Sequence, residues 1–370
     1  MFAKYYSYDD VLLLPNYTDF PLEEIDLETR LIGDIILKTP VISAAMDTVT
    51  GSTMAIEIAR LGGCGVIHRN LSPEEQASKA ARVKMSSVCG EEYSQCTLNK
   101  DRRLCVGAAV APLDYQERLP LLMEAGIDFI VFDVAHGDSA FTLKAIEDCK
   151  KRFHVLVMGG NAATAAGVRR LIDAGSDAVK IGVGAGSICT TRIICGIGVP
   201  QLSAVLDCAT EAAKHNIPAI ADGGLRYSGD LVKAFAAGAS AVMLGNMLAV
   251  SEEAAGENVM NNGKMYKKYR GMGSMDAIAQ GGSGRYQAEK GKPIVPEGVE
   301  GLVPCEGTLK DIMHQIVTGL KKGMWYCGCR NIKEIQNYQQ FIEISAAGLR
   351  ESHAHDVTNI KSAPNYQRHY

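Results

Sequence analysis

Several common features are missing from this sequence, and each absence excludes a class of protein. No uncharged apolar run reaches the ~18 residues of a membrane-spanning helix, and residues 1–6 lack the apolar core of a signal peptide. No cysteine pair has the C-x-x-C spacing of zinc or redox sites, and the 11 cysteines are an odd number. The formal charge of −4 gives no reason to expect nucleic-acid binding. We therefore expect a reduced, cytoplasmic protein that binds neither nucleic acid nor membrane.

Apolar runs that alternate with amphipathic stretches indicate the fold class. Hydrophobic residues make up 47% of the 370 positions, which is enough for a large core. Amphipathic stretches such as 53–61, 73–83 and 163–174 separate most of the apolar runs. Continuous apolar strands joined by helices indicate a parallel sheet covered on both faces. Eight runs are typical of such strands: 41–46, 65–68, 104–109, 129–134, 154–158, 178–182, 219–222 and 241–245.

Eight such units favour an α/β fold of the closed (β/α)8 type, a TIM barrel, over an open doubly wound sheet. We predict a single domain over residues 1–370. Two segments do not fit the repeat: a polar connector at 85–103 and a long Gly-rich insertion at 251–305, after the eighth strand. Loops of this length usually act as lids or are disordered, so we expect a flap within 251–305.

The run from Val183 to Arg192 combines glycines with a cysteine. It follows an apolar run and reads Val-Gly-Ala-Gly-Ser-Ile-Cys-Thr-Thr-Arg. The glycines allow a sharp turn and leave backbone N–H groups free to face an anion. Hydroxyl side chains and an arginine beside Cys189 favour its thiolate form. One interpretation is an enzyme that acts covalently on a phosphorylated substrate; the other is a strand-to-helix turn with a buried cysteine.

A second phosphate signal follows the seventh strand. Asp222 ends that strand, and its carboxylate can accept two hydrogen bonds from a ribose diol. Two glycines come next and admit a phosphate, and a helix that starts at Ser228 adds its dipole. Gly245 and Asn246, after the eighth strand, complete the phosphate site usual in such barrels. The alternative is that Asp222 only caps a helix.

These motifs resemble one family. The catalytic loop of inosine 5'-monophosphate (IMP) dehydrogenases and GMP reductases has the form Gly-x-Gly-Ser-Ile/Val-Cys-Thr-Thr-Arg, and residues 184–192 are similar to it. The likeness continues through 195–201 and extends from 8–13 through 45–50 to 363–366. Most IMP dehydrogenases insert a pair of CBS modules where this chain has only the connector 85–103. This chain either lacks the modules naturally or has had them removed, and GMP reductases commonly lack them too.

The resemblance implies a nucleotide site built around Cys189 as the nucleophile. Asp222 would hold the ribose hydroxyls, and Glu297 would contact N1 of the purine. The phosphate would be held by residues of the three glycine-containing turns and one tyrosine: Ser187, Gly223, Gly224, Gly245, Asn246 and Tyr269. The base would lie along the start of the long insertion: Arg270, Gly271, Met272 and Gly273.

The resemblance also implies NAD as the cofactor. The sequence has no Gly-x-Gly-x-x-Gly that follows a strand and opens a helix, with an acidic residue about twenty positions later. NAD would therefore extend across the barrel mouth, against residues of two loops: Asp133, Val134, Ala135, Gly182, Val183 and Gly184. Asp133 would accept hydrogen bonds from the nicotinamide ribose. Arg285 and Tyr286 would lie on a flap that closes after NADH leaves, where Arg285 helps to activate water. Arginine acts as a base only when it is desolvated or works with a hydroxyl partner such as Thr191.

Finally, the resemblance implies a homotetramer that binds K⁺. Carbonyl groups of one subunit, at Gly184, Gly186 and Cys189, would meet those of a neighbouring tail, at Glu351, Ser352 and His353. Carbonyl oxygens suit a hard monovalent cation. A different metal site from His353, His355 and Asp356 is conceivable, but it has no supporting cysteines and no known spacing.

We predict NAD-dependent oxidation of IMP to xanthosine monophosphate, in guanine nucleotide synthesis, through a covalent adduct on Cys189. GMP reductase, which deaminates GMP with NADPH, is the alternative. Features typical of the dehydrogenase are Arg285-Tyr286, the segments 226–228 and 296–301, and the His-rich tail, whereas 287–292 is closer to the reductases. A non-catalytic nucleotide-binding homologue is a third hypothesis, against which Cys189, Thr191 and Arg285 argue.

Overall fold

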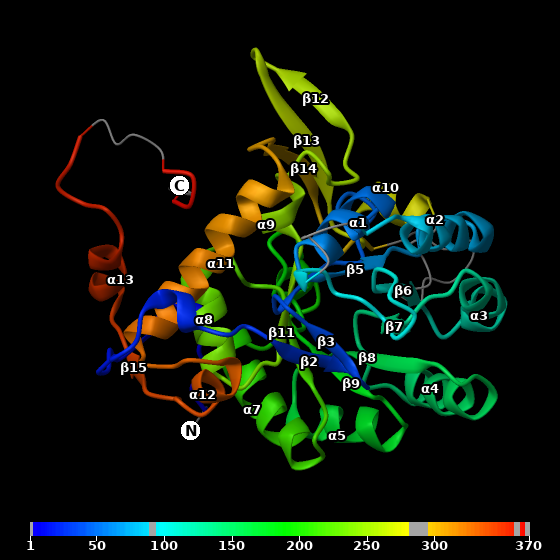
Figure 1. Ribbon diagram of the computed structural model, residues 1–370, viewed down its shortest axis with the longest axis horizontal. Coiled ribbons are helices and arrows are strands. Elements are labelled where there is room, and N and C mark those ends of the chain that lie inside the picture. The colour runs from blue at the N-terminus through cyan, green and yellow to red at the C-terminus, as the bar shows by residue number, and fades with distance from the viewer. Residues whose placement is uncertain (1–2, 89–93, 281–294, 359–362, 367–370) are drawn as a thin grey trace.

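The chain forms a closed barrel of parallel strands surrounded by helices, as the sequence predicts (Figure 1). The computed structural model describes residues 3–88, 94–280, 295–358 and 363–366. All eight predicted strands are present. They follow one another around the barrel in chain order, and the last pairs with the first: β4 (Val41–Ser43), β5 (Cys64–Ile67), β6 (Val106–Val110), β7 (Phe129–Asp133), β8 (Leu156–Ala162), β9 (Ala178–Ile181), β10 (Ala219–Asp222) and β11 (Ala241–Leu244).

A helix follows each barrel strand and covers its outer face. These helices are α1 (Ser52–Arg60), α2 (Pro73–Met85), α3 (Tyr115–Glu124), α4 (Ala140–Arg152), α5 (Ala165–Asp173), α7 (Gln201–Lys214), α8 (Ser228–Ala236) and α11 (Leu309–Tyr326). Local sequence sets their ends. In α2, for example, Pro73 occupies the first turn, Ser72 Oγ accepts from the backbone N–H of Glu75 at 3.1 Å, and the Glu75 carboxylate accepts from the Ser72 N–H at 3.0 Å.

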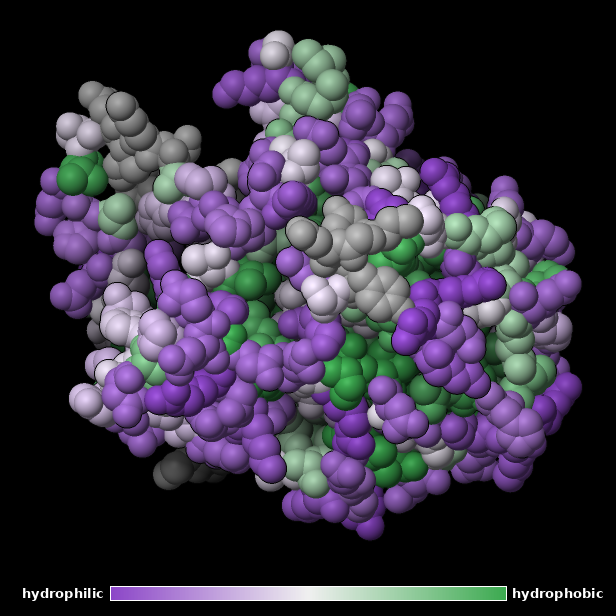
Figure 2. Space-filling view, viewed as in Figure 1, coloured by the Kyte–Doolittle hydropathy of each residue, from purple (hydrophilic) through white to green (hydrophobic). Residues whose placement is uncertain are grey.

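Two layers of core hold the barrel together. The larger lies between the strands and the helices. The smaller fills the barrel interior and includes Leu31, Ile32 and Leu37 from the hairpin β2 (Thr29–Ile32) and β3 (Ile35–Leu37), which closes one end. Figure 2 shows mostly hydrophilic side chains on the viewed face, with hydrophobic ones in small patches. Within the described ranges, no helix is both long and apolar enough to cross a membrane.

The insertion after β11 contains more regular structure than the sequence analysis expected. The strands β12 (Asn258–Asn261), β13 (Lys264–Arg270) and β14 (Glu300–Pro304) form an antiparallel sheet, and α10 (Met275–Ala279) follows β13. Asn262 and Gly263, at φ 50° and 74°, close the β12–β13 hairpin, which projects from the barrel (Figure 1). An Asn-Gly pair between two short strands is a local hairpin signal. Of the segment 251–305, in which a flap was predicted, residues 281–294 lie outside the described ranges.

Short elements complete the chain. The N-terminal strand β1 (Val11–Leu13) pairs with β15 (Phe341–Glu343), so these two segments, far apart in the sequence, lie side by side at one side of the barrel (Figure 1). The remaining elements are the 3-10 turns η1 (Tyr8–Asp10) and η2 (Leu22–Glu24) and the helices α6 (Thr191–Ile194), α9 (Asn246–Ala249), α12 (Ile332–Gln336) and α13 (Ala346–Ser352).

Candidate active site

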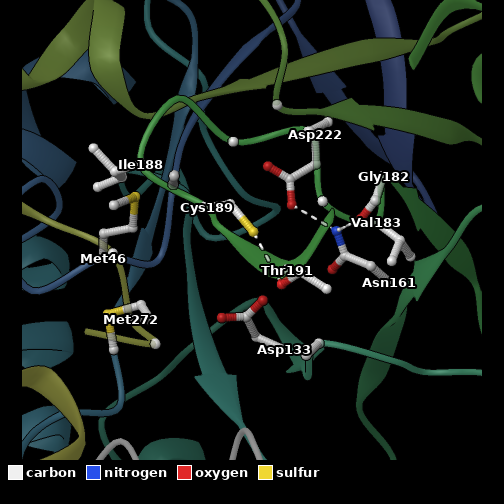
Figure 3. A pocket seen from close by; sticks show the side chains of 18 of the residues that line it. Met46, Asp133, Asn161, Gly182, Val183, Ile188, Cys189, Thr191, Asp222 and Met272 are labelled. Atoms are coloured by element: carbon white, nitrogen blue, oxygen red, sulfur yellow. Dashed lines mark hydrogen bonds between the residues drawn. The ribbon is translucent and has the colours of Figure 1, made fainter. Parts of the chain in front are cut away.

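The loop from β9 to α6 places Cys189 at the C-terminal mouth of the barrel. Its Sγ lies 3.1 Å from Thr191 Oγ1 (Figure 3), and its N–H donates to the Gly186 carbonyl at 3.1 Å. Gly182, where the loop begins, has φ 142°, and a Cβ there would lie 2.2 Å from the Asp222 carbonyl oxygen. Only glycine therefore allows the ends of β9 and β10 to approach this closely.

The segment just before β14 lies against this loop. The Thr190 N–H donates to the Glu297 carbonyl at 2.9 Å, and the Val299 N–H donates to the Ile188 carbonyl at 3.0 Å. These bonds bring the Glu297 side chain to Thr191, whose hydroxyl donates to Glu297 Oε2 at 2.7 Å. The thiol, the hydroxyl and the carboxylate thus form a continuous hydrogen-bonded chain along which a proton can move.

The start of the insertion forms the other wall beside Cys189. The Gly271 N–H donates to the Val299 carbonyl at 3.0 Å, and the Glu297 N–H donates to the Gly273 carbonyl at 3.0 Å. The side chain of Met272 lies across the cavity from Asp222 in Figure 3. Residues 271–273 therefore form a narrow backbone strap at the cavity. A flat base could be read there through main-chain groups.

Arg270 fixes the start of this strap to the barrel. Its guanidinium is bidentate to the Asp47 carboxylate, with Nη2 to Oδ2 at 2.6 Å and Nε to Oδ1 at 3.2 Å. Burial weakens the competition from water, and the Asp47 hydrogen bond raises the pKa of Arg270. The Arg270 side chain is occupied by this ion pair and does not line the cavity.

A buried polar cluster lies on the opposite side of the cavity. Asn161 Nδ2 donates to Asp222 Oδ2 at 2.9 Å and to the Gly182 carbonyl at 2.8 Å (Figure 3). Lys180, from β9, extends between Asp133 and Asp222 and forms an ion pair with each. The carboxylates of Asp133 and Asp222 are thereby held at the cavity wall. Carboxylates in this position can accept hydrogen bonds from sugar hydroxyls.

The cavity continues past Asp222 toward Ser187, Gly223 and Tyr269. Ser187 Oγ and the Tyr269 hydroxyl lie 3.4 Å apart, and burial raises the pKa of Tyr269 to about 12, so that its hydroxyl stays protonated and can donate. Gly223, with φ 92°, turns the chain so tightly that a Cβ there would lie 3.2 Å from the Gly186 nitrogen. Asn246 begins α9 nearby. This end suits an anion.

Two adjoining cavities, of about 140 and 310 Å³, together contain most of the predicted site. The first holds Cys189, Thr191, Glu297 and Met272 beside Asp133 and Asp222. The second holds Ser187, Gly224, Gly245 and Asn246. Asp222, Gly223 and Tyr269 line both. The combined space is of the size expected for a small-molecule site.

Comparison with known proteins assigns this barrel to a family. The sequence profile of the IMP dehydrogenase / GMP reductase domain matches residues 5–355. The chain belongs to this family. It is 42% identical to an inosine-5'-monophosphate dehydrogenase of Cryptosporidium parvum, over 99% of this chain and 98% of that one. It is 41% identical to an inosine-5'-monophosphate dehydrogenase of Aquifex aeolicus, over 97% of each chain.

Some residues that the family resemblance implied are not part of these cavities. Val134 is buried and lines neither one, although Ala135, Val183 and Gly184 do. The tail residues Glu351, Ser352 and His353 lie at the end of α13, away from both cavities. His353 Nδ1 lies 3.1 Å from the Tyr366 hydroxyl, and its ring packs near that of Tyr227. Arg285 and Tyr286 lie outside the described residues.

In the part of the chain that the structure describes, the cysteines and acidic side chains form no separate metal centre. The ten cysteines within the described residues are free thiols. No group of three His, Cys, Asp or Glu side chains suited to a metal ion is found in the described ranges. The alternative site of His353, His355 and Asp356 therefore has no support among the described residues.

The structure places two further residues in the candidate site, Lys180 and Asn161, for which the sequence predicted no role. Lys180 lies within a buried strand, and a charged residue is rarely fully buried unless it is paired. The sequence contains this signal, because Lys180 is a charged residue in the middle of the apolar run 178–182. Asn161 lies inside β8, which extends to Ala162, four residues beyond the predicted end of that strand.

Proposed function

We propose that this chain oxidises IMP to xanthosine monophosphate with NAD⁺, in guanine nucleotide synthesis. The observation that supports this most directly is the place of Cys189 between three different sub-sites. The anion-binding end suits the 5'-phosphate, the Asp222 carboxylate suits the ribose diol, and the strap 271–273 suits a purine. A nucleotide bound in this order presents the base, and not the sugar, to the thiol.

The chemistry follows from the hydrogen-bonded chain at Cys189. The thiolate adds to C2 of IMP, and the thiol proton passes through the Thr191 hydroxyl toward the Glu297 carboxylate. NAD⁺ supplies the acceptor for the hydride that leaves C2. The thioimidate left on Cys189 is then hydrolysed, which releases xanthosine monophosphate and restores the thiol. Overall, IMP, NAD⁺ and water give xanthosine monophosphate, NADH and a proton.

The residues beside the thiol fit the nicotinamide half of NAD. Ala135, Val183 and Gly184 line the cavity next to Asp133, so a flat ring there meets mostly small or apolar groups. The Asp133 carboxylate would hold the nicotinamide ribose. We propose that Arg285 and Tyr286, from the segment 281–294, activate the hydrolytic water together with Thr191.

We also propose that the active form is a homotetramer that binds K⁺. Gly184, Gly186 and Cys189 belong to one short loop, and backbone carbonyls suit a hard monovalent cation. The tail residues 351–353 do not reach that loop within one chain, so they would have to come from a neighbouring subunit. The ion would hold the shape of the loop that carries Cys189.

Two parallel incubations test the proposed function. The protein is mixed with IMP and NAD⁺, and separately with GMP and NADPH, while the absorbance of the reduced cofactor is followed. We expect NADH to form in the first mixture, with xanthosine monophosphate identified by mass spectrometry. Loss of NADPH in the second mixture alone would instead establish the reductase activity, and no change in either would support a non-catalytic homologue.

A further inference from the structure

Lys180 is the most deeply buried charged group at the site. Its side chain is 1% exposed, and its ammonium has three oxygen partners: Asp133 Oδ1 at 3.0 Å, Asn161 Oδ1 and Asp222 Oδ2. An ammonium has three N–H donors, so each donor has one partner. The partners come from β7, β8 and β10, and Lys180 itself comes from β9.

The ammonium occupies one side of the Asp222 carboxylate and leaves the other side available. Oδ2 accepts from Lys180 and from Asn161 Nδ2, whereas Oδ1 has no hydrogen-bond partner within the described residues. Asp222 is therefore held in one orientation by two donors on a single oxygen. A ribose diol that approaches from the cavity meets a carboxylate that is already oriented, and this lowers the entropic cost of binding.

We propose that Lys180 is a positioning residue that couples the two ribose sites, because one ammonium orients both Asp222 and Asp133. The inference rests on the proposed function, in which Asp222 holds the IMP ribose and Asp133 holds the nicotinamide ribose. The carboxylates of Asp133 and Asp222 share one ammonium at the cavity wall, and without it two like charges this close repel each other. Without the ammonium they would turn apart or take up a proton, and both ribose sites would lose their shape together.

A variant series tests this proposal by equilibrium binding. Lys180→Met removes the charge and all three donors, whereas Lys180→Arg keeps a cation. IMP and NAD⁺ are titrated separately by isothermal titration calorimetry, and IMP is also titrated by its protection of the Cys189 thiol from alkylation. We expect Lys180→Met to weaken the binding of IMP and of NAD⁺ by about tenfold or more each. Lys180→Arg should recover most of each loss of affinity.

Lys84 provides a matched control. It is also a buried lysine paired with an aspartate, Asp128, and its ammonium donates to the Leu104 carbonyl at 2.8 Å. Asp128 precedes β7, whereas Asp133 ends it, so the Lys84 pair lies at the opposite end of the barrel. Lys84→Met should lower the melting temperature and leave both affinities within about twofold of wild type, since it cannot alter either ribose site.

The outcomes separate this proposal from the proposed function. If folded Lys180→Met binds both nucleotides normally, or loses only one of them, the coupling is wrong. The same conclusion follows if its only change is a lower melting temperature, as in Lys84→Met. If Lys180→Met does not fold, Lys180→Gln keeps a donor without the charge and must show the same paired loss. A wild-type protein that binds neither IMP nor NAD⁺ would instead reject the proposed function itself.

Discussion

The ion pair between Asp47 and Arg270 provides a direct test of how the strap 271–273, the proposed purine contact, is held. Asp47 follows β4, Arg270 ends β13, and three nitrogen–oxygen contacts of 2.6 to 3.2 Å join their side chains. The side chains are 7% and 16% exposed. Asp47 also accepts from Asn70 Nδ2 at 2.7 Å. Replacing Asp47 by asparagine keeps its size but removes the charge that Arg270 faces.

The free-energy cost of Asp47→Asn follows from the burial of the Asp47–Arg270 ion pair. Removing one partner of a fully buried ion pair costs ~3–5 kcal/mol, whereas exposed pairs contribute ~1 kcal/mol or less. This pair is mostly buried, so we expect about 2 kcal/mol. Arg270 directly precedes residues 271–273, and in the proposed function this strap must be ordered when the purine binds. Asp47→Asn should therefore weaken IMP binding by up to about thirtyfold, since ~1.4 kcal/mol corresponds to a tenfold change in affinity.

The assay compares ligands with and without the base. IMP and ribose 5-phosphate are titrated calorimetrically against wild type and Asp47→Asn. Only IMP should lose affinity, because ribose 5-phosphate lacks the purine that we propose the strap contacts. The control is Lys268→Met on the same strand, whose pair with Glu257 is exposed at 57% and 67% and should leave IMP binding unchanged. An equal loss for both ligands, or none for either, would refute the assignment of the strap to the base.

Four further predictions concern the remaining parts of the site. Cys189→Ala should abolish NADH formation and keep IMP binding, because the phosphate and ribose contacts lie elsewhere; appreciable residual turnover would remove Cys189 from its role. Arg285→Ala should give a near-normal first burst of NADH and then stall as an adduct on Cys189 that intact-protein mass spectrometry detects, with a steady-state loss of about 10²- to 10⁴-fold. Loss of the burst as well would assign Arg285 to binding or folding. Activity should need K⁺, with Na⁺ and Li⁺ poor substitutes, and deletion of the tail from Glu351 should abolish the response; full activity in K⁺-free buffer would count against the shared site. Burial lowers the pKa of His68 from its ordinary 6.5 to about 4, so the unfolded chain binds a proton that the folded chain excludes. The contribution of His68 to the free energy of unfolding is therefore fully present above pH 6.5. It falls by up to about 3 kcal/mol as the pH drops toward 4. Measured by urea unfolding, the free energy of unfolding of His68→Phe should fall less between pH 6.5 and pH 4 than that of wild type. The same fall in both proteins would show that His68 is not the group responsible.

Local sequence patterns were sufficient to predict the barrel, and they singled out the loop that carries Cys189. The strands are continuous apolar runs, and the helices between them carry amphipathic spacing, so each element is encoded within a few residues of itself. The loop around Cys189 was recognisable for the same reason, because its glycines and hydroxyl residues are contiguous. The Asn262-Gly263 hairpin is also encoded locally, within the segment 251–305 that was predicted only as a long insertion.

The contacts that orient the site were decided by the tertiary structure. Thr191 and Glu297 are 106 residues apart, and Asp47 and Arg270 are 223 apart, so no local pattern relates either pair. Lys180 contacts three carboxylate or amide groups only because the closed barrel brings the ends of β7, β8, β9 and β10 together. Side-chain direction along a strand alternates with every residue, so its partners depend on strand order and register. The sequence by itself predicts Cys189 as the nucleophile, and closure of the barrel decided which groups surround it.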